Sequence, residues 1–210
     1  MRAVVAREGL CAYPDGMSRR LALFLWVALV AVAWIAPPTR PDLWEWVAKV
    51  MAGDWSGENP LLIAQFNLMG IWPVLFGVLL APQWRDRPLP SWPFVVASMM
   101  VGAFSLLLFF VFRRGPPEQV VRPDWTRWVT LAMGFMAAGL MAWGLLAGDP
   151  TDWYTQWRSE GLVFVMTADF LVLVVAFAME ARAQGLRWPL ALFPVAGSAA
   201  SLWPSTSDGS

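Results

Sequence analysis

Three polar side chains lie inside apolar stretches of the sequence, where they could bind a proton or a small cation. Asp169 lies within the apolar stretch 162–179, and Gln65 and Asn67 lie within 61–81. A carboxylate in hydrocarbon is unfavourable by several kcal/mol unless it is paired, protonated or reached by water, so an acid there indicates a functional site by default. We predict that these three side chains meet between helices as a ligand or proton site.

A structural role for the same residues is at least as well supported. Hydrocarbon offers amides no water to bond, so Gln65 and Asn67 should face other helices. A protonated Asp169 would donate a hydrogen bond to one of these amides and clamp two helices together. Both interpretations remain open at the level of sequence.

Most other chemistry is excluded by residue type. The chain has no histidine and one cysteine, Cys11. These counts exclude histidine-ligated haem, chlorophyll or zinc, an internal disulfide, and nucleophilic mechanisms that need histidine. Asp149 and Asp152 have the spacing of a magnesium–diphosphate motif, but without a second acidic cluster they indicate a turn and a helix cap. We therefore predict no catalytic residue, no metal site and no identifiable cofactor.

The composition is that of a membrane protein. Of 210 residues, 58% are hydrophobic and only 14% charged, whereas about a quarter are charged in soluble domains. Lys+Arg and Asp+Glu number 15 each, so no basic surplus indicates nucleic-acid binding. Many of the 15 tryptophans lie near the ends of apolar stretches, as expected for residues at the headgroup level of a bilayer.

The pattern of apolar stretches predicts an all-α polytopic protein with five or six membrane-spanning helices in one domain, 21–203. The expected spans are 21–36, 61–81, 92–112, 128–146, 162–179 and a weaker, proline-split segment, 188–203. Segment 42–52 has the apolar periodicity of an interfacial helix, with Asp42 as its N-cap. Tail 1–20 is expected to be disordered or not part of the native protein, tail 204–210 is expected to be disordered, and we find no internal repeat.

Small residues and a proline predict where the helices pack closely. Within the second span these are Gly70 and Pro73, and within the third Gly102, four residues after Ser98. In the fourth span Gly134, Ala138 and Ala142 recur every four residues; this stripe could pack inside the molecule or form a dimer interface. At the span ends, Arg113 and Glu180 are expected to reach water, and an ion pair between Arg113 or Arg114 and Glu180 is allowed.

Several short motifs resemble a family of polytopic membrane proteins, without an established activity, from cyanobacteria and chloroplasts. The motifs include Asn59-Pro60-Leu61, the stretch 66–73 (FNLMGIWP) and Ala168-Asp169-Phe170. At the end of the third span the relatives have a Leu-Leu-Pro-Tyr-like sequence, where this chain has Leu-Leu-Phe-Phe. The resemblance implies a thylakoid or cytoplasmic membrane.

Three functions are compatible with the sequence. The first is a non-enzymatic scaffold, assembly or accessory protein, in contact with the lipid bilayer and with photosynthetic complexes, which could bind a lipid or a pigment. The second is a carrier of a small solute or of protons that uses Asp169 with Gln65 and Asn67. The third, a membrane enzyme acting on a lipid or isoprenoid, has the least support.

Overall fold

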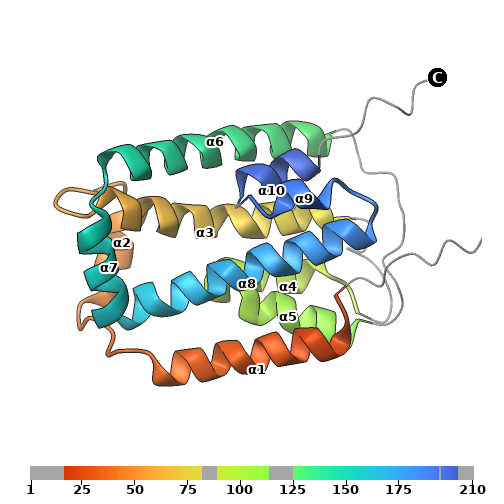
Figure 1. Ribbon diagram of the computed structural model, residues 1–210, viewed down its shortest axis with the longest axis horizontal. Helices are drawn as coiled ribbons and strands as arrows, with labels where there is room; N and C mark the ends of the chain where they lie inside the picture. Colours follow the sequence, from red (N-terminus) through yellow and green to blue (C-terminus); the bar gives the residue numbers. More distant parts are fainter. Residues whose placement is uncertain (1–16, 82–88, 114–124, 194, 203–210) are drawn as a thin grey trace, which may run out of the picture.

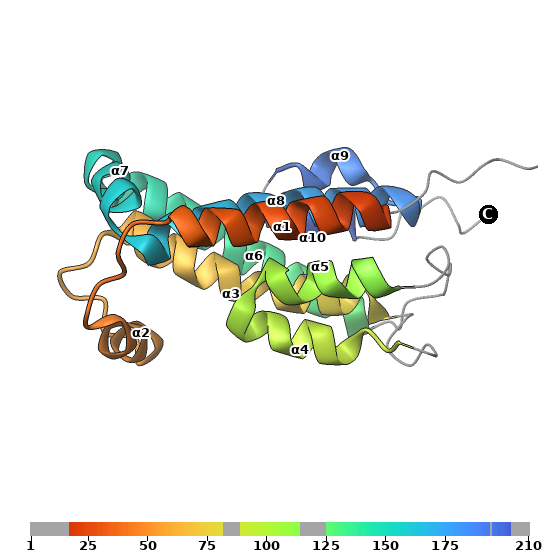
Figure 2. The same ribbon diagram turned by 90° about the horizontal axis from the view of Figure 1, so that it is seen from below.

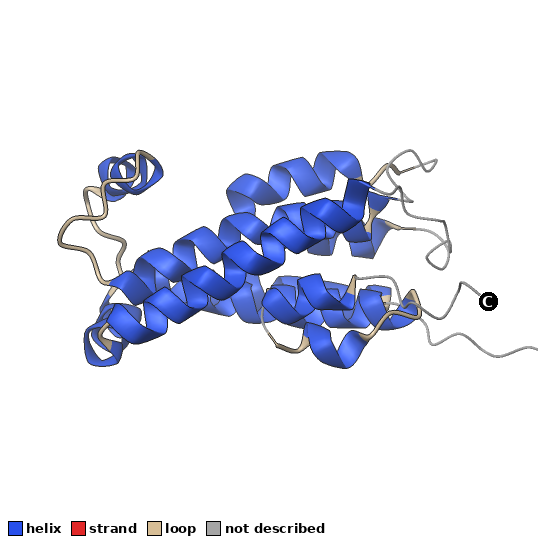
Figure 3. Ribbon diagram, turned by 90° about the horizontal axis from the view of Figure 1, so that it is seen from above, coloured by secondary structure: helices blue, strands red, loops and turns tan. Residues whose placement is uncertain are grey.

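A computed structural model describes residues 17–81, 89–113, 125–193 and 195–202, and every regular element in these ranges is a helix (Figures 1 and 3). The predicted all-α class is confirmed. The predicted tails 1–20 and 204–210 lie outside the described residues except for residues 17–20, of which Arg19 already begins the first helix. The helices are α1 (Arg19–Ile35), α2 (Leu43–Met51), α3 (Pro60–Leu79), α4 (Trp92–Val101), α5 (Ala103–Phe112), α6 (Trp125–Ala147), α7 (Pro150–Ser159), α8 (Gly161–Ala183), α9 (Trp188–Ala191) and α10 (Ala196–Ser201).

Long apolar helices form the body of the protein. In the described part of the chain, α3, α6 and α8 are long and apolar enough to cross a membrane. The 17 residues of α1 lie beside them and extend about 26 Å at 1.5 Å per residue. The chain is therefore an integral membrane protein. Its central helix is α3, which begins with Asn59 as N-cap and Pro60 in the first turn, and which contains buried Pro73.

The predicted interfacial helix is present as α2. One side of α2 buries Trp46 and Val50 against the bundle, while Trp44 and Met51 on the other side are 76% and 74% exposed. Asp42 lies at the N-cap position but makes no capping hydrogen bond. Its carboxylate instead accepts a 2.8 Å hydrogen bond from Arg40, which lowers the pKa of Asp42 from its usual range.

The predicted third span, 92–112, is wrong, because this segment folds back on itself as a helical hairpin. The chain reverses at Gly102, whose φ of +55° is unfavourable for other residues. The Ser105 hydroxyl donates to the carbonyl of Phe94 at 2.9 Å, although these residues would lie about 16 Å apart in a straight helix. Each arm has 10 residues, about 15 Å, which is half the thickness of a bilayer's hydrocarbon layer.

The weaker sixth segment, 188–203, is a second and shorter hairpin made by α9 and α10. Its backbone also takes a positive φ at the turn, +57° at Val195. Three residues later, the Ser198 hydroxyl donates to the carbonyl of Ala191 at 3.2 Å, as Ser105 does three residues after Gly102. Each hairpin also begins with a Trp-Pro pair, Trp92-Pro93 and Trp188-Pro189.

These correspondences reveal an internal duplication that we did not find in the sequence. The described residues of 19–112 form a first repeat and those of 125–201 a second; each consists of a long helix, a surface helix, a second long helix and a helical hairpin. The hairpin helices have 10 residues each in the first repeat but only four and six in the second. Equivalent helices make equivalent contacts, since α5 packs on α1 as α10 packs on α6, and α4 packs on α3 as α9 packs on α8. The two hairpins lie on opposite sides of the long helices (Figure 2).

The central helices of the two repeats have similar burial patterns. When each position of α3 is aligned with the position 101 later in α8, the burial class agrees at 13 of the 20 positions of α3 and differs at others, such as Ile63 and Phe164. Phe76 and Phe177 are both fully buried and face each other, with ring centroids 5.3 Å apart. Both hairpins enter from the end of the bundle where α1 begins and α8 ends, here called the hairpin face. The opposite end carries α2 and α7 and is called the α2/α7 face (Figure 1).

The predicted packing residues differ in how they pack within the molecule. At Gly134 an added Cβ would lie 3.3 Å from Ala199 of α10, so this contact is intramolecular. Ala138 and Ala142 are exposed, since the buried side of α6 runs through Ala137 and Gly144; for these two residues the dimer interface stays a prediction. Gly70 is exposed, with no atom within 4 Å of an added Cβ, so it packs against no described residue.

Candidate functional site

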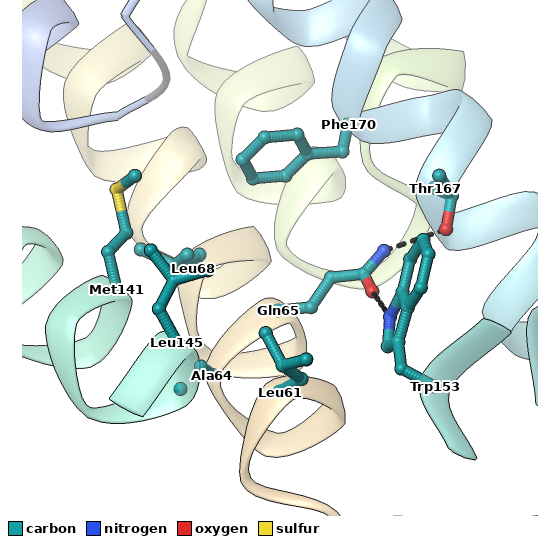
Figure 4. Close-up of a pocket in the computed structure, with 10 residues that line it drawn as sticks. Leu61, Ala64, Gln65, Leu68, Met141, Leu145, Trp153, Thr167 and Phe170 are labelled. Atoms are coloured by element: carbon teal, nitrogen blue, oxygen red, sulfur yellow. Dashed lines mark hydrogen bonds between the residues drawn. The ribbon is translucent and has the colours of Figure 1, made fainter. Parts of the chain in front are cut away.

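Gln65 links three helices through its side-chain amide. It accepts a hydrogen bond from the indole N–H of Trp153 in α7 at 2.7 Å and donates one to the Thr167 hydroxyl in α8 at 2.9 Å (Figure 4). Thr167 in turn donates to the carbonyl of Val163. Because an amide has two N–H donors and two acceptor lone pairs, Gln65 retains one of each for a further partner.

Asn67 has a local role. Its amide donates to the carbonyl of Ile63, one turn earlier in its own helix, at 2.8 Å. The side chain is partly exposed on the side of α3 that also carries exposed Gly70. Asn67 therefore satisfies its donor within α3 and makes no described hydrogen bond to Gln65 or Asp169.

Asp169 lies against the tip of the first hairpin. One carboxyl oxygen, Oδ1, accepts a 2.8 Å hydrogen bond from the backbone N–H of Ala103, the first residue of α5. The residue is 4% exposed, and its second oxygen, Oδ2, has no hydrogen-bond partner. A Cβ added to Gly102 would overlap this carboxyl group, so glycine is required both for the backbone conformation and for the approach of Asp169.

The predicted cluster of Gln65, Asn67 and Asp169 is not joined by hydrogen bonds in this structure. Successive helical residues are rotated by about 100°, so Thr167 and Asp169 point roughly 200° apart around α8. Thr167 faces α3 and Gln65, while Asp169 faces α5. The Trp153 and Ala103 partners were not predicted, because Trp153 lies outside the predicted spans and Ala103 donates through its backbone.

A cavity of about 260 Å³ lies beside Gln65 at the contact of the two repeats (Figure 4). Leu61, Ala64 and Leu68 of α3 line it, together with Met141 and Leu145 of α6 and Phe170 of α8. Gln65, Thr167 and the Trp153 indole contribute its polar atoms. Leu145 is 67% exposed, so the cavity opens between α6 and α8 at the surface that lipid would contact.

Comparison of the repeats shows that the polar groups break their symmetry. Gln65 of α3 corresponds to Met166 of α8, and Asp169 of α8 corresponds to Leu68 of α3. The fourth residue of each surface helix is a tryptophan, Trp153 in α7 and Trp46 in α2. Trp153 bonds to Gln65, whereas the buried indole N–H of Trp46 has no partner. The interior polar groups of the central helices therefore differ between the repeats: Gln65 in the first, and Asp169 and Glu180 in the second, have the apolar counterparts Met166, Leu68 and Leu79.

A buried ion pair holds the base of the first hairpin. Arg113, directly after α5, donates two hydrogen bonds to the Glu180 carboxylate of α8, at 2.6 and 3.1 Å. The Glu180 side chain is fully buried and that of Arg113 is 11% exposed. Gln184 also donates to Glu180 and to the carbonyl of Leu79. The allowed Arg113–Glu180 pair is therefore present, and Arg114 lies outside the described residues.

The acidic pair at the α2/α7 face is a cap. Asp149 accepts the N–H groups of Thr151 and Asp152, while the Asp152 carboxylate accepts from Asn59 and Gln156. No group of three or more His, Cys, Asp or Glu residues that could hold a metal ion occurs within the described ranges. The turn-and-cap interpretation of these two aspartates is confirmed.

Comparison with known proteins gives no relative: no protein-family model, no curated protein and no solved structure matches this chain.

Proposed function

We propose that the protein is a non-enzymatic accessory protein of its membrane, and that it holds one hydrocarbon chain of a lipid or isoprenoid-type molecule in the cavity beside Gln65. The observation that carries the proposal is the cavity itself. It has apolar walls, an opening toward the lipid at Leu145, and the Gln65 amide, which retains one donor and one acceptor for a further hydrogen bond. Ligand pockets generally combine mainly apolar walls with a few placed polar groups.

The size and polarity of the cavity restrict the ligand. A volume of about 260 Å³ lies below the ~300–1,000 Å³ of pockets that enclose drug-sized molecules. It therefore suits a single chain whose remainder lies in the bilayer, rather than a tetrapyrrole ring. The free N–H of Gln65 can donate to an ester or ketone oxygen, which a lipid or a quinone-type headgroup would supply.

We expect Leu145→Trp to close the opening of the cavity and to reduce the lipid that copurifies with the protein. A penalty of about 1.4 kcal/mol, within the range for overfilled sites, lowers binding about tenfold. The measurement is native mass spectrometry and lipid analysis of protein extracted in mild detergent. Leu146→Trp is the matched control, because Leu146 is 88% exposed and does not line the cavity.

Gln65→Leu is a second, independent test, since it removes the amide but keeps the apolar walls. It should lower the occupancy of an ester- or ketone-bearing ligand more than that of a plain hydrocarbon. If both Leu145→Trp and Gln65→Leu retain the lipid content of the unmodified protein, the cavity does not bind a ligand chain and the proposal fails.

We place this accessory function in a photosynthetic or cytoplasmic membrane, on the resemblance carried by the Asn59-Pro60 and 66–73 motifs alone. The expected partners are membrane complexes that assemble there. Affinity purification of the tagged protein from a photosynthetic host should recover photosystem subunits or assembly intermediates. Recovery of none, under conditions that preserve other membrane complexes, would remove this part of the proposal.

A carrier of protons or small solutes is a second candidate, favoured by the duplicated architecture. Many carriers consist of two repeats whose discontinuous helices meet near the bilayer midplane. Here the half-length hairpin α4/α5 ends beside Asp169, about 12 Å from the start of α8. Purified protein in liposomes should then show a proton flux, reported by an enclosed pH-sensitive dye, that is lost in Asp169→Asn. Equal proton flux in both proteins would exclude this candidate.

A further inference from the structure

The tip of the first hairpin is hydrogen-bonded to the second repeat by one carboxyl group at mid-depth, far from the Arg113–Glu180 ion pair at its base. Asp169 of α8 occupies the position at which α3 has Leu68, so the carboxyl is not required by the duplicated fold. Its Oδ1 accepts the N–H of Ala103, and Oδ2 is buried without a hydrogen bond. An interior carboxyl with one unused oxygen is a group that can accept a proton.

No charged side chain in the described residues is seen to pair with this carboxyl group. α3, α4 and α5 contain no charged residue; those of α1, Arg19 and Arg20, lie in its first turn at the hairpin face, where Arg19 donates to the carbonyl of Val111, and those of α7, Asp152 and Arg158, lie at the opposite face. Along α8 the nearest charged residues are Glu160 at its N-cap, nine positions or about 14 Å away, and Glu180, 11 positions or about 16 Å away and paired with Arg113. The remaining positive potential at Asp169 comes from the N-terminus of α5, equivalent to about half an elementary charge.

We infer that Asp169 is a proton-binding site and that its protonation releases the tip of the α4/α5 hairpin from α8. In the ionised form, Oδ1 makes a charge-assisted hydrogen bond to Ala103, and the N-terminus of α5 stabilises the negative charge. A proton taken from water binds Oδ2, and the charge disappears. The bond to Ala103 then becomes a neutral one, about half as strong, and the interaction with the helix terminus is lost.

The second hairpin provides an internal control, because its tip has no equivalent group. No side chain caps the start of α10, and the residues of α9 and α10 include no acid or base. Proton binding at Asp169 should therefore loosen α4/α5 and leave α9/α10 unchanged. This inference concerns a different place from the cavity beside Gln65 and does not depend on a ligand there.

Hydrogen–deuterium exchange of the full-length protein in lipid nanodiscs tests the inference. After correction for the intrinsic pH dependence of exchange, peptides containing 98–106 should lose protection on the order of fivefold to tenfold between pD 8 and pD 5. Peptides containing 188–200 should not change. Asp169→Asn, which has no charge at either pD, should show the low-pD level of protection throughout.

Two results would overturn the inference. One is protection of 98–106 that is independent of pD in the unmodified protein, which needs no variant to interpret. The other is an Asp169→Asn protein that elutes as a monodisperse species, yet protects 98–106 as the unmodified protein does at pD 8. A loss of protection that extends equally to 188–200 would also count against it, because it would report general loosening.

Discussion

Gly102→Val is expected to be the most destabilising single substitution in the protein. Gly102 has a φ of +55°, where a side chain costs about 1–2 kcal/mol, and an added Cβ would overlap the carboxyl group of Asp169. Forcing additional atoms into a packed interior costs a further 1–3 kcal/mol or so. We therefore expect a loss on the order of 3 kcal/mol, seen as a fall of roughly 10 °C in the thermal unfolding midpoint in detergent.

Gly139→Val is the matched control for this prediction. Gly139 lies in the middle of α6, is exposed, and has no atom within 4 Å of an added Cβ. It should change the midpoint by no more than a surface substitution does. The double variant Gly102→Ala with Asp169→Ala should recover part of the loss, because it removes the overlap but keeps the unfavourable φ. A Gly102→Val protein as stable as Gly139→Val would show that 92–112 does not reverse at this residue.

Glu180→Leu should have the next largest effect. It removes the buried carboxylate that accepts both hydrogen bonds of Arg113, and truncating one partner of a buried ion pair typically costs about 3–5 kcal/mol. Since Arg113 directly follows α5, the base of the hairpin should separate from α8. The measurement is the thermal unfolding midpoint, together with proteolysis at the hairpin face.

The companion variants identify the cause. Replacing Arg113 and Glu180 together with leucine should restore much of the stability, because buried ion pairs can often be exchanged for apolar residues at little cost. Glu45→Gln in α2 is a control for removing an exposed carboxylate and should have little effect. If the double variant is no more stable than Glu180→Leu, the loss comes from the packing of Glu180 and not from an unpaired Arg113.

Much of the helical content could be predicted from the sequence, because the underlying signals are local. The apolar stretches around α3, α6 and α8 are long enough to be recognised by length alone. The periodicity of 42–52 also predicts α2, since one side of that short helix is apolar. The caps at Asn59 and Asp149 follow from residues that bond their own backbone two or three positions later.

The hairpin and the duplication could not be predicted in this way. Segment 92–112 has the length and hydropathy of a span, and only the backbone conformation of Gly102 reverses it. The two repeats resemble each other more in which positions are buried than in which residues occupy those positions. Phe76 matches Phe177, but Leu79 matches Glu180, and both members of each pair are fully buried.

The sequence predicted which polar residues lie in the interior, but it did not predict which groups they hydrogen-bond to. Gln65 and Asp169 are interior polar groups, as expected for amides and acids in apolar stretches. Their partners depend on rotation around α8 and on the position of a hairpin tip, neither of which a sequence window contains. Trp153 resembled an interfacial tryptophan in sequence, and its bond to Gln65 depends on how α7 packs.

A segment that enters and leaves through the same face changes the sidedness of everything after it. In an alternating six-span arrangement, lysine and arginine divide almost equally between the two sides. Among the described residues, the hairpin face carries Arg19, Arg20, Arg113, Arg127, Arg182 and Arg187, and the α2/α7 face carries Arg40, Lys49 and Arg158. From the positive-inside rule we expect the hairpin face, and so the first residue of α1 and the last of α8, to lie in the cytoplasm. A reporter fused to the C-terminus that is fluorescent only in the cytoplasm should be bright; a dark fusion at normal expression would reverse the assignment.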